Sequence, residues 1–492
     1  MPPPQAPPLP IQALPAWASL YDVNFYSVRL ENMKGRGIGL AAAQPLSLAA
    51  GHEGATDDRP LLKVPRDLVL SIEAVEQYAK IDHHFHELLD ATGHQTPRGH
   101  IVLYLLAHLA SSKSQALGMP DSKIVSTGWT EYIKFLPREI PVPTLWTDAE
   151  RSLLAGTSLE SAVNAKMASL SNEFEQVRTA ASGVRFWDAL LGNSRAVDAQ
   201  DWALVDAWYR SRCLELPSAG EAMVPCVDMA NHSNEPDAYY DEDGDGNVEI
   251  LLRPGFGVTE GDEVTISYGE FKSAAEMLFS YGFIDRDSGR EEATLVLNSL
   301  PDDPLARAKV HVFGSLPTVR LSRKDGRVTW EAPFLSLACL NEEDGLDFRL
   351  LQDNEGGREL RVFWQEEDVT DRASDFQSLI KDHPIFAVFQ LRMVAMLAQQ
   401  LTSQLEQIQA PHIDEETDGS SPNPELRDVC VDAARMLREV EGSLLEGALG
   451  ALQEQQTTLL ADDKVKEYLG AAEAAAEDGQ DQDPARPEAE VQ

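Results

Sequence analysis

The sequence predicts an α+β fold, in which small β-sheets flank a long helical insertion and a mainly helical domain follows. Three observations carry this prediction. Apolar residues recur at helical spacing over residues 75–210, and they do so again over residues 376–408 and 425–460. A third is that short runs rich in β-branched residues lie on both sides of the insertion, separated by turns that contain glycine or proline. These strand-like runs are residues 28–30, 61–64, 248–252 and 264–267.

The domain organisation follows from these patterns. Residues 1–20 are expected to form a disordered Pro-rich tail, because prolines crowd its first half. The sheets and their helical insertion then occupy residues 21–285, and the mainly helical domain occupies residues 290–470. Residues 471–492 consist largely of Ala, Glu, Asp and Gln, which predicts an acidic disordered tail.

Local signals fix several elements inside these domains. Ser273 is a good N-cap, and Glu276 three residues later completes a capping box, so a helix should begin there. Residues 324–326 read Lys-Asp-Gly between two β-rich runs and predict a hairpin. Residues 411–424 are rich in Ser, Pro and Asp and should link the two long C-terminal helices.

The charge of the chain limits its partners. Its 492 residues contain 41 Lys and Arg against 81 Asp and Glu, a formal net charge of −40. A nucleic-acid binder would need a basic stripe, so direct binding of nucleic acid is not expected. An acidic field favours encounter with a basic protein partner, and a surface charged only for solubility is the alternative.

The chain has the composition of a cytoplasmic or nuclear protein. Its 4 cysteines are scattered, with neither a disulfide framework nor zinc-ligand spacing. The first residues lack the basic and apolar regions of a signal peptide. The apolar run at residues 101–109 is far shorter than the roughly 20 residues needed to cross a bilayer. We therefore expect no membrane association and a monomer in a reducing compartment.

Three segments could carry chemistry. Residues 35–39 read Gly-Arg-Gly-Ile-Gly, which predicts either a tight hairpin or a backbone that approaches a ligand closely. Asn231 and His232 are polar residues in an apolar run, and they need partners from the neighbouring backbone or from a ligand. Tyr268 and Tyr281 each precede a glycine and lie on either side of one short predicted helix, so both rings could face a single cavity.

Two other patterns are better explained by structure. Residues 241–246 imitate the opening of an EF-hand, but Leu252 stands where a bidentate Glu belongs, which favours an exposed acidic turn. Residues 83–86 read His-His-Phe-His, but they lack a carboxylate together with a third ligand at matching spacing, which favours a solvated helix face. We expect no metal site and, without a nucleophile elbow around Ser233 or Ser273, no hydrolase chemistry.

The ordered set of these segments resembles the SET-domain protein methyltransferases, and in particular the non-histone group that includes the Rubisco large-subunit methyltransferases. The segments that carry the resemblance are Gly35-Arg36-Gly37, Ser211-Arg212, the run from Asp228 through Asn231-His232 to Ser233, and Tyr268 with Tyr281-Gly282-Phe283. The resemblance covers residues 25–285 in two parts. It implies S-adenosylmethionine as cofactor, a helical insertion, and a C-terminal domain that helps hold a protein substrate.

The resemblance also implies roles for individual residues. Arg36, Gly37 and Ile38 should contact the cofactor largely through backbone groups, and Arg212 should face its carboxylate. Asn231 and His232 should hold its adenine and amino-acid ends. Tyr281 should line the methyl-transfer channel, and Tyr268 occupies the place of the family's catalytic tyrosine.

The chemistry of lysine methylation is consistent with these roles. At pH 7 only about one lysine amine in 2,500 is neutral, which corresponds to a deficit of about 4.6 kcal/mol. A desolvated channel beside a positive sulfonium lowers the amine pKa, and alignment of the reacting atoms supplies further acceleration. We expect Tyr268 to orient the reactants rather than to act as a general base.

The sequence therefore predicts a protein-lysine N-methyltransferase that acts on a basic protein such as a ribosomal protein, an elongation factor or a histone. One alternative is a non-catalytic SET-like module that binds a basic partner. Another is a protein-histidine methyltransferase, although Val227 stands where the histidine enzyme of this group carries an aromatic residue.

Overall fold

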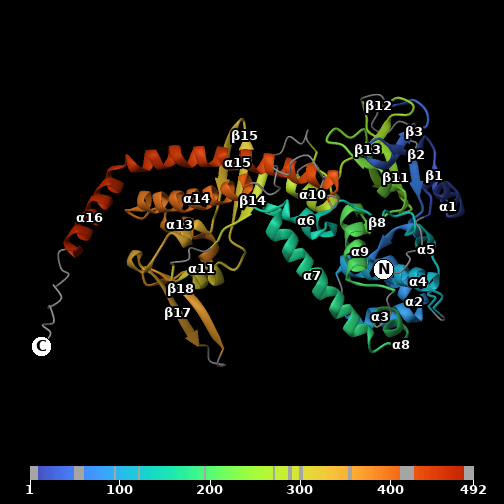
Figure 1. Ribbon diagram of the computed structural model, residues 1–492, viewed down its shortest axis with the longest axis horizontal. Helices are drawn as coiled ribbons and strands as arrows, with labels where there is room; N and C mark the ends of the chain where they lie inside the picture. Colours follow the sequence, from blue (N-terminus) through green and yellow to red (C-terminus); the bar gives the residue numbers. More distant parts are fainter. Residues whose placement is uncertain are drawn as a thin grey trace, which may run out of the picture. The chain divides into compact units, whose positions relative to one another are not determined.

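The computed structural model describes residues 9–48, 60–93, 96–119, 122–192, 196–269, 272–285, 291–298, 303–352, 357–410 and 426–480, the last nine of these by backbone only. The chain forms two compact units. The first comprises Met1–Arg151, Ser161–Ser288 and Leu426–Ala433, and the second comprises Ser152–Glu160, Gly289–Glu425 and Ala434–Gln492. Figure 1 shows short strands and many helices in the first unit, and strands with long helices in the second.

Among the described residues of the first unit, four small sheets form the β-structure, and each combines segments that are distant in the sequence. They are β1 (Asn24–Phe25), β5 (Leu62–Val64), β11 (Val248–Leu252) and β10 (Ala238–Glu242); β2 (Val28–Met33), β3 (Gly37–Ala42), β13 (Glu263–Ile266) and β9 (Asn231–His232); β6 (Leu70–Ser71), β8 (Gly220–Met223) and β7 (Cys213–Leu216); and β12 (Gly257–Val258) with β4 (Leu46–Ser47).

Helices precede, separate and follow these strands in the described part of the chain up to residue 281. They are α1 (Leu14–Leu20), α2 (Ile72–Ile81), α3 (His83–Thr92), α4 (Pro97–Ala116), α5 (Gly128–Tyr132), α6 (Asp148–Ser152), α7 (Ser158–Ala181), α8 (Arg185–Trp187), α9 (Ala199–Arg212) and α10 (Ala274–Tyr281), with short 3-10 turns at Ile11–Ala13, Arg66–Leu68, Pro143–Leu145 and Val227–Met229 and a π turn at Asp188–Gly192.

α4 is the centre of the helical part, because its side chains from Ile101 to Ala110 are all buried. Such all-round burial is typical of a core helix rather than an amphipathic surface helix. α9 packs directly against α4 and ends at Arg212, where β7 begins. The core thereby fixes the position at which Arg212 enters the site.

The second unit holds two three-stranded antiparallel sheets and several helices. The sheets are β14 (Glu292–Val296), β15 (Thr318–Lys324) and β16 (Arg327–Glu331), and β17 (Leu346–Gln352), β18 (Arg358–Trp364) and β19 (Glu367–Asp368). The helices are α11 (Ala306–Phe313), α12 (Leu335–Ala338), α13 (Phe376–Ile380), α14 (Phe386–Gln409), α15 (Asp428–Leu460) and α16 (Asp463–Gln480), with 3-10 turns at Glu342–Asp344 and Thr370–Asp375.

The α+β class with small sheets and a helical C-terminal region is confirmed. Helices run from residue 72 to residue 212, close to the expected insertion. Lys324 ends β15 and Arg327 begins β16, so the hairpin lies where the Lys-Asp-Gly turn predicts it. Ser273 caps α10, and its side chain accepts a hydrogen bond from the Glu276 backbone N–H at 3.3 Å.

The expected disordered tail over residues 1–20 is wrong for its second half. Residues 11–20 form a 3-10 turn and α1, and Leu14 and Trp17 are buried in the core of the first unit. The Trp17 indole N–H also donates to the carbonyl of Gly128 at 3.1 Å. The proline content led to the wrong prediction, because a proline at the start of a helix costs no hydrogen bond and is therefore compatible with α1. Residues 1–8 lie outside the described residues.

The C-terminal regions also differ from the expectation in detail. The domain expected to be mainly helical carries two three-stranded sheets in addition to its helices. The backbone of α16 is helical to Gln480, so the acidic tail expected from residue 471 overlaps a helix, and residues 481–492 lie outside the described part. The predicted linker over residues 411–424 is likewise outside it. No helix of the described residues is long and apolar enough to cross a membrane.

Candidate active site

A parallel strand pair brings the predicted site segments into one sheet. β9 lies parallel to β13, with Asn231 opposite Thr265 and His232 opposite Ile266. On its other edge β13 pairs with β3, where Glu263 lies opposite Ala41. The glycine hairpin β2–β3, the Asn-His strand and the strand that leads to Tyr268 are therefore neighbours, although more than 190 residues separate Arg36 from Asn231.

Two positions of the hairpin favour glycine, each for a different physical reason. Gly37 has φ +75°, a left-handed conformation that favours glycine at the turn. A Cβ on Gly39 would lie 2.6 Å from a Glu263 carboxylate oxygen and 2.8 Å from the Asn231 side-chain nitrogen. A side chain there would displace the Glu263 and Asn231 side chains from these positions. The cluster is thus a tight hairpin, and its backbone lies close against functional side chains.

Glu263 joins the hairpin to the Asn-His strand. Its carboxylate accepts a hydrogen bond from Arg36 Nη1 at 2.6 Å and one from Asn231 Nδ2 at 2.7 Å. The other Arg36 terminal nitrogen donates to the carbonyl oxygen of His232. Asn231 also lies 3.4 and 3.5 Å from the carbonyl oxygens of Arg36 and Ile38. Arg36, Ile38, Asn231 and His232 therefore form one network through a glutamate that the sequence did not single out.

His232 connects this network to Tyr268. Its Nδ1 accepts the backbone N–H of Tyr268 at 3.0 Å, so the ring carries its hydrogen on Nε2, which lies 3.3 Å from Asn234 Oδ1. Burial lowers the pKa of His232, which keeps the ring neutral in this arrangement. The His232 and Tyr268 rings are stacked, with centroids 5.3 Å apart.

The two predicted tyrosines lie side by side. Their ring centroids are 4.6 Å apart, and the Tyr281 hydroxyl donates to the backbone carbonyl of Tyr268 at 3.2 Å. The Tyr268 hydroxyl donates to the carbonyl of Ala230 at 2.8 Å, next to Asn231 in the chain. Burial raises the pKa of both phenols to about 12, so both stay protonated at neutral pH.

A buried carboxylate positions Arg212. Arg212 Nη1 donates to the backbone carbonyl of Asp228 at 2.8 Å and lies 3.3 Å from its carboxylate. The other carboxylate oxygen accepts the hydroxyl of Tyr132, which in turn accepts the backbone N–H of Cys226 at 2.8 Å. Burial raises the pKa of Asp228, and the Arg212 guanidinium opposes that effect. Arg212 Nε has no hydrogen-bond partner among the described residues.

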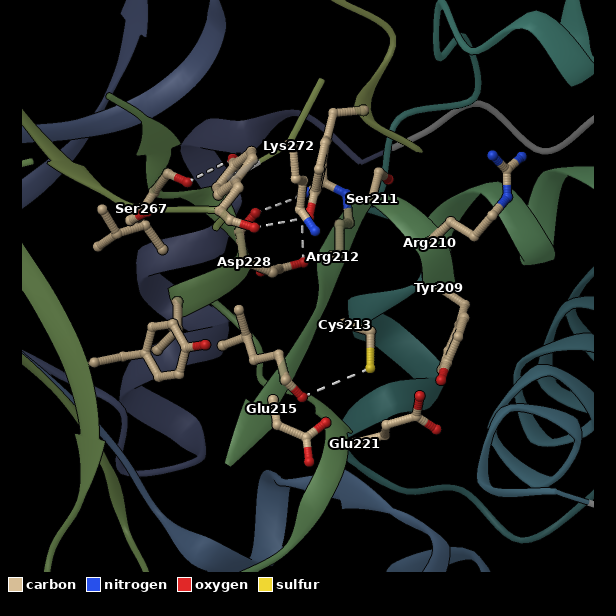
Figure 2. A pocket seen from close by; sticks show the side chains of 17 residues that line it. Tyr209, Arg210, Ser211, Arg212, Cys213, Glu215, Glu221, Asp228, Ser267 and Lys272 are labelled. Atoms are coloured by element: carbon tan, nitrogen blue, oxygen red, sulfur yellow. Dashed lines mark hydrogen bonds and ion pairs between the residues drawn. The ribbon is translucent and has the colours of Figure 1, made fainter. Parts of the chain in front are cut away.

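A cavity of about 340 Å³ lies beside these groups (Figure 2). Its walls include Arg212, Tyr268 and Tyr281, together with Tyr240 and Cys213. Burial raises the pKa of the Cys213 thiol to about 12, and it also raises the pKa of Tyr240. This part of the cavity is consequently lined by uncharged phenols and a thiol, which suits a long side chain that enters without its charge.

All eight residues predicted from the sequence lie in this region. The residues missed by the sequence reasoning are Glu263 in the network, Tyr132 beneath Asp228, and Cys213, Tyr209 and Tyr240 in the cavity wall. These residues had no local signal, whereas Asp228 had one, because it opens the segment that contains Asn231. The other patterns are structural: the acidic turn over residues 241–246 joins β10 to β11, and His83, His84 and His86 lie on α3 with acidic partners. The described residues contain no group of three or more His, Cys, Asp or Glu that could hold a metal ion.

Curated proteins of known name are similar to this chain. SET domain-containing protein 8 of Schizosaccharomyces pombe is 30% identical over 277 residues, which cover 56% of this chain and 61% of that protein. The Rubisco large-subunit N-methyltransferase of Nicotiana tabacum is 26% identical over 197 residues, 37% of this chain and 38% of that protein. The actin-histidine N-methyltransferase of Danio rerio is 23% identical over 381 residues, 72% of this chain and 57% of that protein. The aligned part thus spans less than two thirds of each of these relatives, and the chain matches no protein-family model.

Solved structures establish the fold. The SET domain of LSMT bound to lysine and AdoHcy aligns with a TM-score of 0.65 at 20% identity, over 91% of this chain and 92% of that one. Rubisco LSMT bound to AdoMet aligns with a TM-score of 0.64 over the same shares. The resemblance inferred from the ordered motifs is therefore confirmed at the level of the fold and of sequence relationship.

Proposed function

Because the chain is similar in sequence and in fold to the Rubisco large-subunit methyltransferases, we propose that it is a SET-domain enzyme that methylates the side-chain nitrogen of lysine in a protein, with S-adenosylmethionine as methyl donor. The observation that carries the proposal is the position of Tyr268. Its ring lines the cavity, while its backbone N–H is held by His232 of the Asn-His strand. One residue thus links the cavity to the predicted cofactor-binding network.

The residues present fit the cofactor. The hairpin at Gly37 leaves its backbone open, since a Cβ built there meets no atom within 4 Å, so a ligand can approach the backbone. Asn231 and His232 lie next to that hairpin and offer amide and imidazole groups. Arg212 keeps a hydrogen-bonding nitrogen without a partner among the described residues, which suits a carboxylate. When bound, S-adenosylmethionine supplies a methyl group on a positive sulfonium.

The cavity fits the acceptor. A lysine amine must lose its proton before it can attack, and the part of the cavity that is lined by phenols and the Cys213 thiol disfavours the charged form. S-adenosylmethionine, held by the hairpin backbone, Asn231, His232 and Arg212, would supply the methyl group to this neutral amine and would leave as its thioether, and one further proton would have to leave the nitrogen to give a neutral product. Tyr268, whose hydroxyl is held by the Ala230 carbonyl, restricts the position of the amine on one side.

The substrate class is proposed from the relatives and the charge. The names of the relatives specify Rubisco, fructose-bisphosphate aldolase and ribosomal proteins as substrates of those enzymes. A chain with a net charge of −40 favours a basic partner, so we propose a basic, non-histone protein such as a ribosomal protein or an elongation factor. The cytoplasm or the nucleus stays the predicted location.

The substitution Tyr268→Phe tests the proposal. It removes the hydroxyl but keeps the ring, so binding of S-adenosylmethionine measured by calorimetry should change less than about threefold, while methyl transfer falls by about 10²–10³, the cost of one lost orienting group. Transfer of labelled methyl from the cofactor into a cell lysate gives the turnover. Cofactor binding without any transfer by the wild-type chain would support a binding module instead.

Mass spectrometry of the labelled protein decides between acceptors. Methyl-lysine supports the proposal, and methyl-histidine would replace it by the alternative that the relationship to the actin-histidine enzyme keeps open. The matched control is Tyr239→Phe, on strand β10 next to Tyr240 but outside the cavity lining, which should leave both measurements unchanged.

A further inference from the structure

A second cavity, of about 720 Å³, lies in the first unit. Its lining comes mainly from residues 138–151, from α7 and from the start of α9, and none of the described residues belongs both to it and to the active-site cavity. Its larger apolar side chains are Ile140, Leu145, Trp146, Met167, Leu170 and Leu204. This volume and this apolar lining are typical of a site that binds a small molecule.

The lining contains a guanidinium whose charge is poorly compensated, that of Arg138. Two of its nitrogens, Nε and Nη1, are buried and have no hydrogen-bond partner, and the described residues give Arg138 no salt bridge. Its Cζ lies over the buried Trp208 ring, 5.2 Å from the ring centroid, a contact that holds the side chain in place but satisfies none of its hydrogen bonds. Burial lowers the pKa of Arg138, because the charged form loses more to desolvation than it gains from its surroundings.

The other charged side chains of the lining are paired with one another, cap a helix or are exposed. Asp201 attracts Arg138, but its carboxylate forms a salt bridge with Lys113 at 2.6 Å. The Asp198 side chain caps the start of α9, and Glu139 is exposed. The two remaining cations have carboxylate partners, Asp148 for Arg151 and Glu150 for Arg427. Arg138 is therefore the cation of this lining that is left for a ligand.

We infer that this cavity binds a small molecule that carries one carboxylate on an apolar body, and that Arg138 binds the carboxylate. A guanidinium matches a carboxylate with two parallel hydrogen bonds, and because its charge is delocalised, an anion at any of its edges compensates for it. The apolar side chains of the wall then cover the rest of the ligand.

The charges of the lining favour a carboxylate over a phosphate ester. One negative charge matches the one cation that has no partner, whereas a phosphate monoester carries nearly two charges at neutral pH. The second charge would lie in a lining that also contains Asp198 and Glu139. The inference goes beyond the proposed function, because it concerns no residue of the methyl-transfer cavity.

Calorimetry of the full chain with paired probes tests the site. The probes are the phenyl-substituted acids from phenylacetate to 5-phenylpentanoate, each with its amide, which keeps the shape and removes the charge. The best acid should bind at least about tenfold more tightly than its amide, as expected for hydrogen bonds to a charged group. Phenyl phosphate should bind more weakly than that acid. Saturating S-adenosylmethionine should leave the binding of the acid unchanged, because the two cavities share no described lining residue.

Variants of Arg138 assign the preference to this residue. In Arg138→Met, which keeps an unbranched apolar side chain over Trp208, the acid and the amide should bind within about twofold of each other. Arg138→Lys keeps the charge but not the planar fork, so it should retain part of the preference. The matched control is Arg178→Met, because Arg178 is an exposed arginine on α7 outside the cavity lining, and it should keep the full preference.

Three results would overturn the inference. The first is that no acid of the series binds more tightly than its amide, and the second is that Arg138→Met keeps the preference. The third is displacement of the acid by S-adenosylmethionine, which would place the probe in the active site. Tighter binding of phenyl phosphate than of every acid would overturn the assignment of a carboxylate. None of these measurements uses methyl transfer, so they are independent of the proposed function.

Discussion

Glu441 is the clearest case in which the structure predicts a pH-dependent stability. It lies on α15 of the second unit and is only 2% exposed. Its carboxylate accepts the backbone N–H of Ser158 at 2.8 Å and also the Ser158 hydroxyl. Burial raises its pKa from 4.5 to about 7, although both hydrogen bonds from Ser158 oppose the rise. The substitution Glu441→Gln keeps the shape and removes the titration.

The sign and size of the effect follow from proton linkage. A carboxyl group with a raised pKa binds its proton more tightly in the folded state, so unfolding releases that proton between about pH 4.5 and pH 7. Stability is therefore lost as the pH rises through that range and is constant above it. The full difference corresponds to about 3 kcal/mol, and the slope cannot exceed about 1.4 kcal/mol per pH unit.

Hydrogen-exchange mass spectrometry of the α15 peptides measures this effect inside one unit. The free energy of opening of the wild type minus that of Glu441→Gln should fall by about 3 kcal/mol between about pH 4.5 and pH 8. Taking the difference removes other titrations, such as that of His108, whose pKa burial lowers to about 3. A difference that stays constant within about 0.5 kcal/mol would show that the carboxyl group titrates normally and would refute the reasoning.

Three further outcomes are expected. Asp228→Asn leaves the Arg212 guanidinium, which is 17% exposed, without its buried counter-ion and should lower the free energy of unfolding by about 3–5 kcal/mol, measured by chemical denaturation. Gly282→Ala should cost about 1–3 kcal/mol in thermal unfolding, because Gly282 has φ +84° and a Cβ would lie 2.8 Å from the Pro141 backbone. The pH profile of methyl transfer should rise with the titration of the acceptor lysine and show no break from Tyr268 below about pH 12.

Features coded in short segments could be predicted from the sequence. The capping box of α10, the glycine hairpin and the Lys-Asp-Gly turn depend on residues within a few positions of one another. The order of the motifs added information on long-range contacts, which local patterns lack. It implied that Asn231, His232 and Tyr268 lie close together. The parallel pairing of β9 with β13 realises that meeting.

The missed features depend on long-range contacts. Glu263 is one of many acidic residues in the chain, and nothing near it shows that it accepts hydrogen bonds from Arg36 and Asn231. Tyr132 contacts Asp228 across 96 positions of sequence, and only packing of the core identifies that pair. α1 was not predicted for a different reason. Prolines at the start of a helix and prolines in a disordered tail give the same composition.

The geometry also limits what Tyr268 can do. Its hydroxyl donates to the Ala230 carbonyl, and burial keeps the pKa of the phenol near 12, so the phenolate that a general base requires is scarce at neutral pH. Placing a phenolate there would cost that hydrogen bond and would bury a negative charge beside the uncharged ring of Tyr281. In the proposed reaction the acceptor therefore loses its proton through desolvation rather than to Tyr268. The rate then depends on how well the cavity holds a neutral amine in line with the methyl group, which is a property of its shape and of the position of Tyr268.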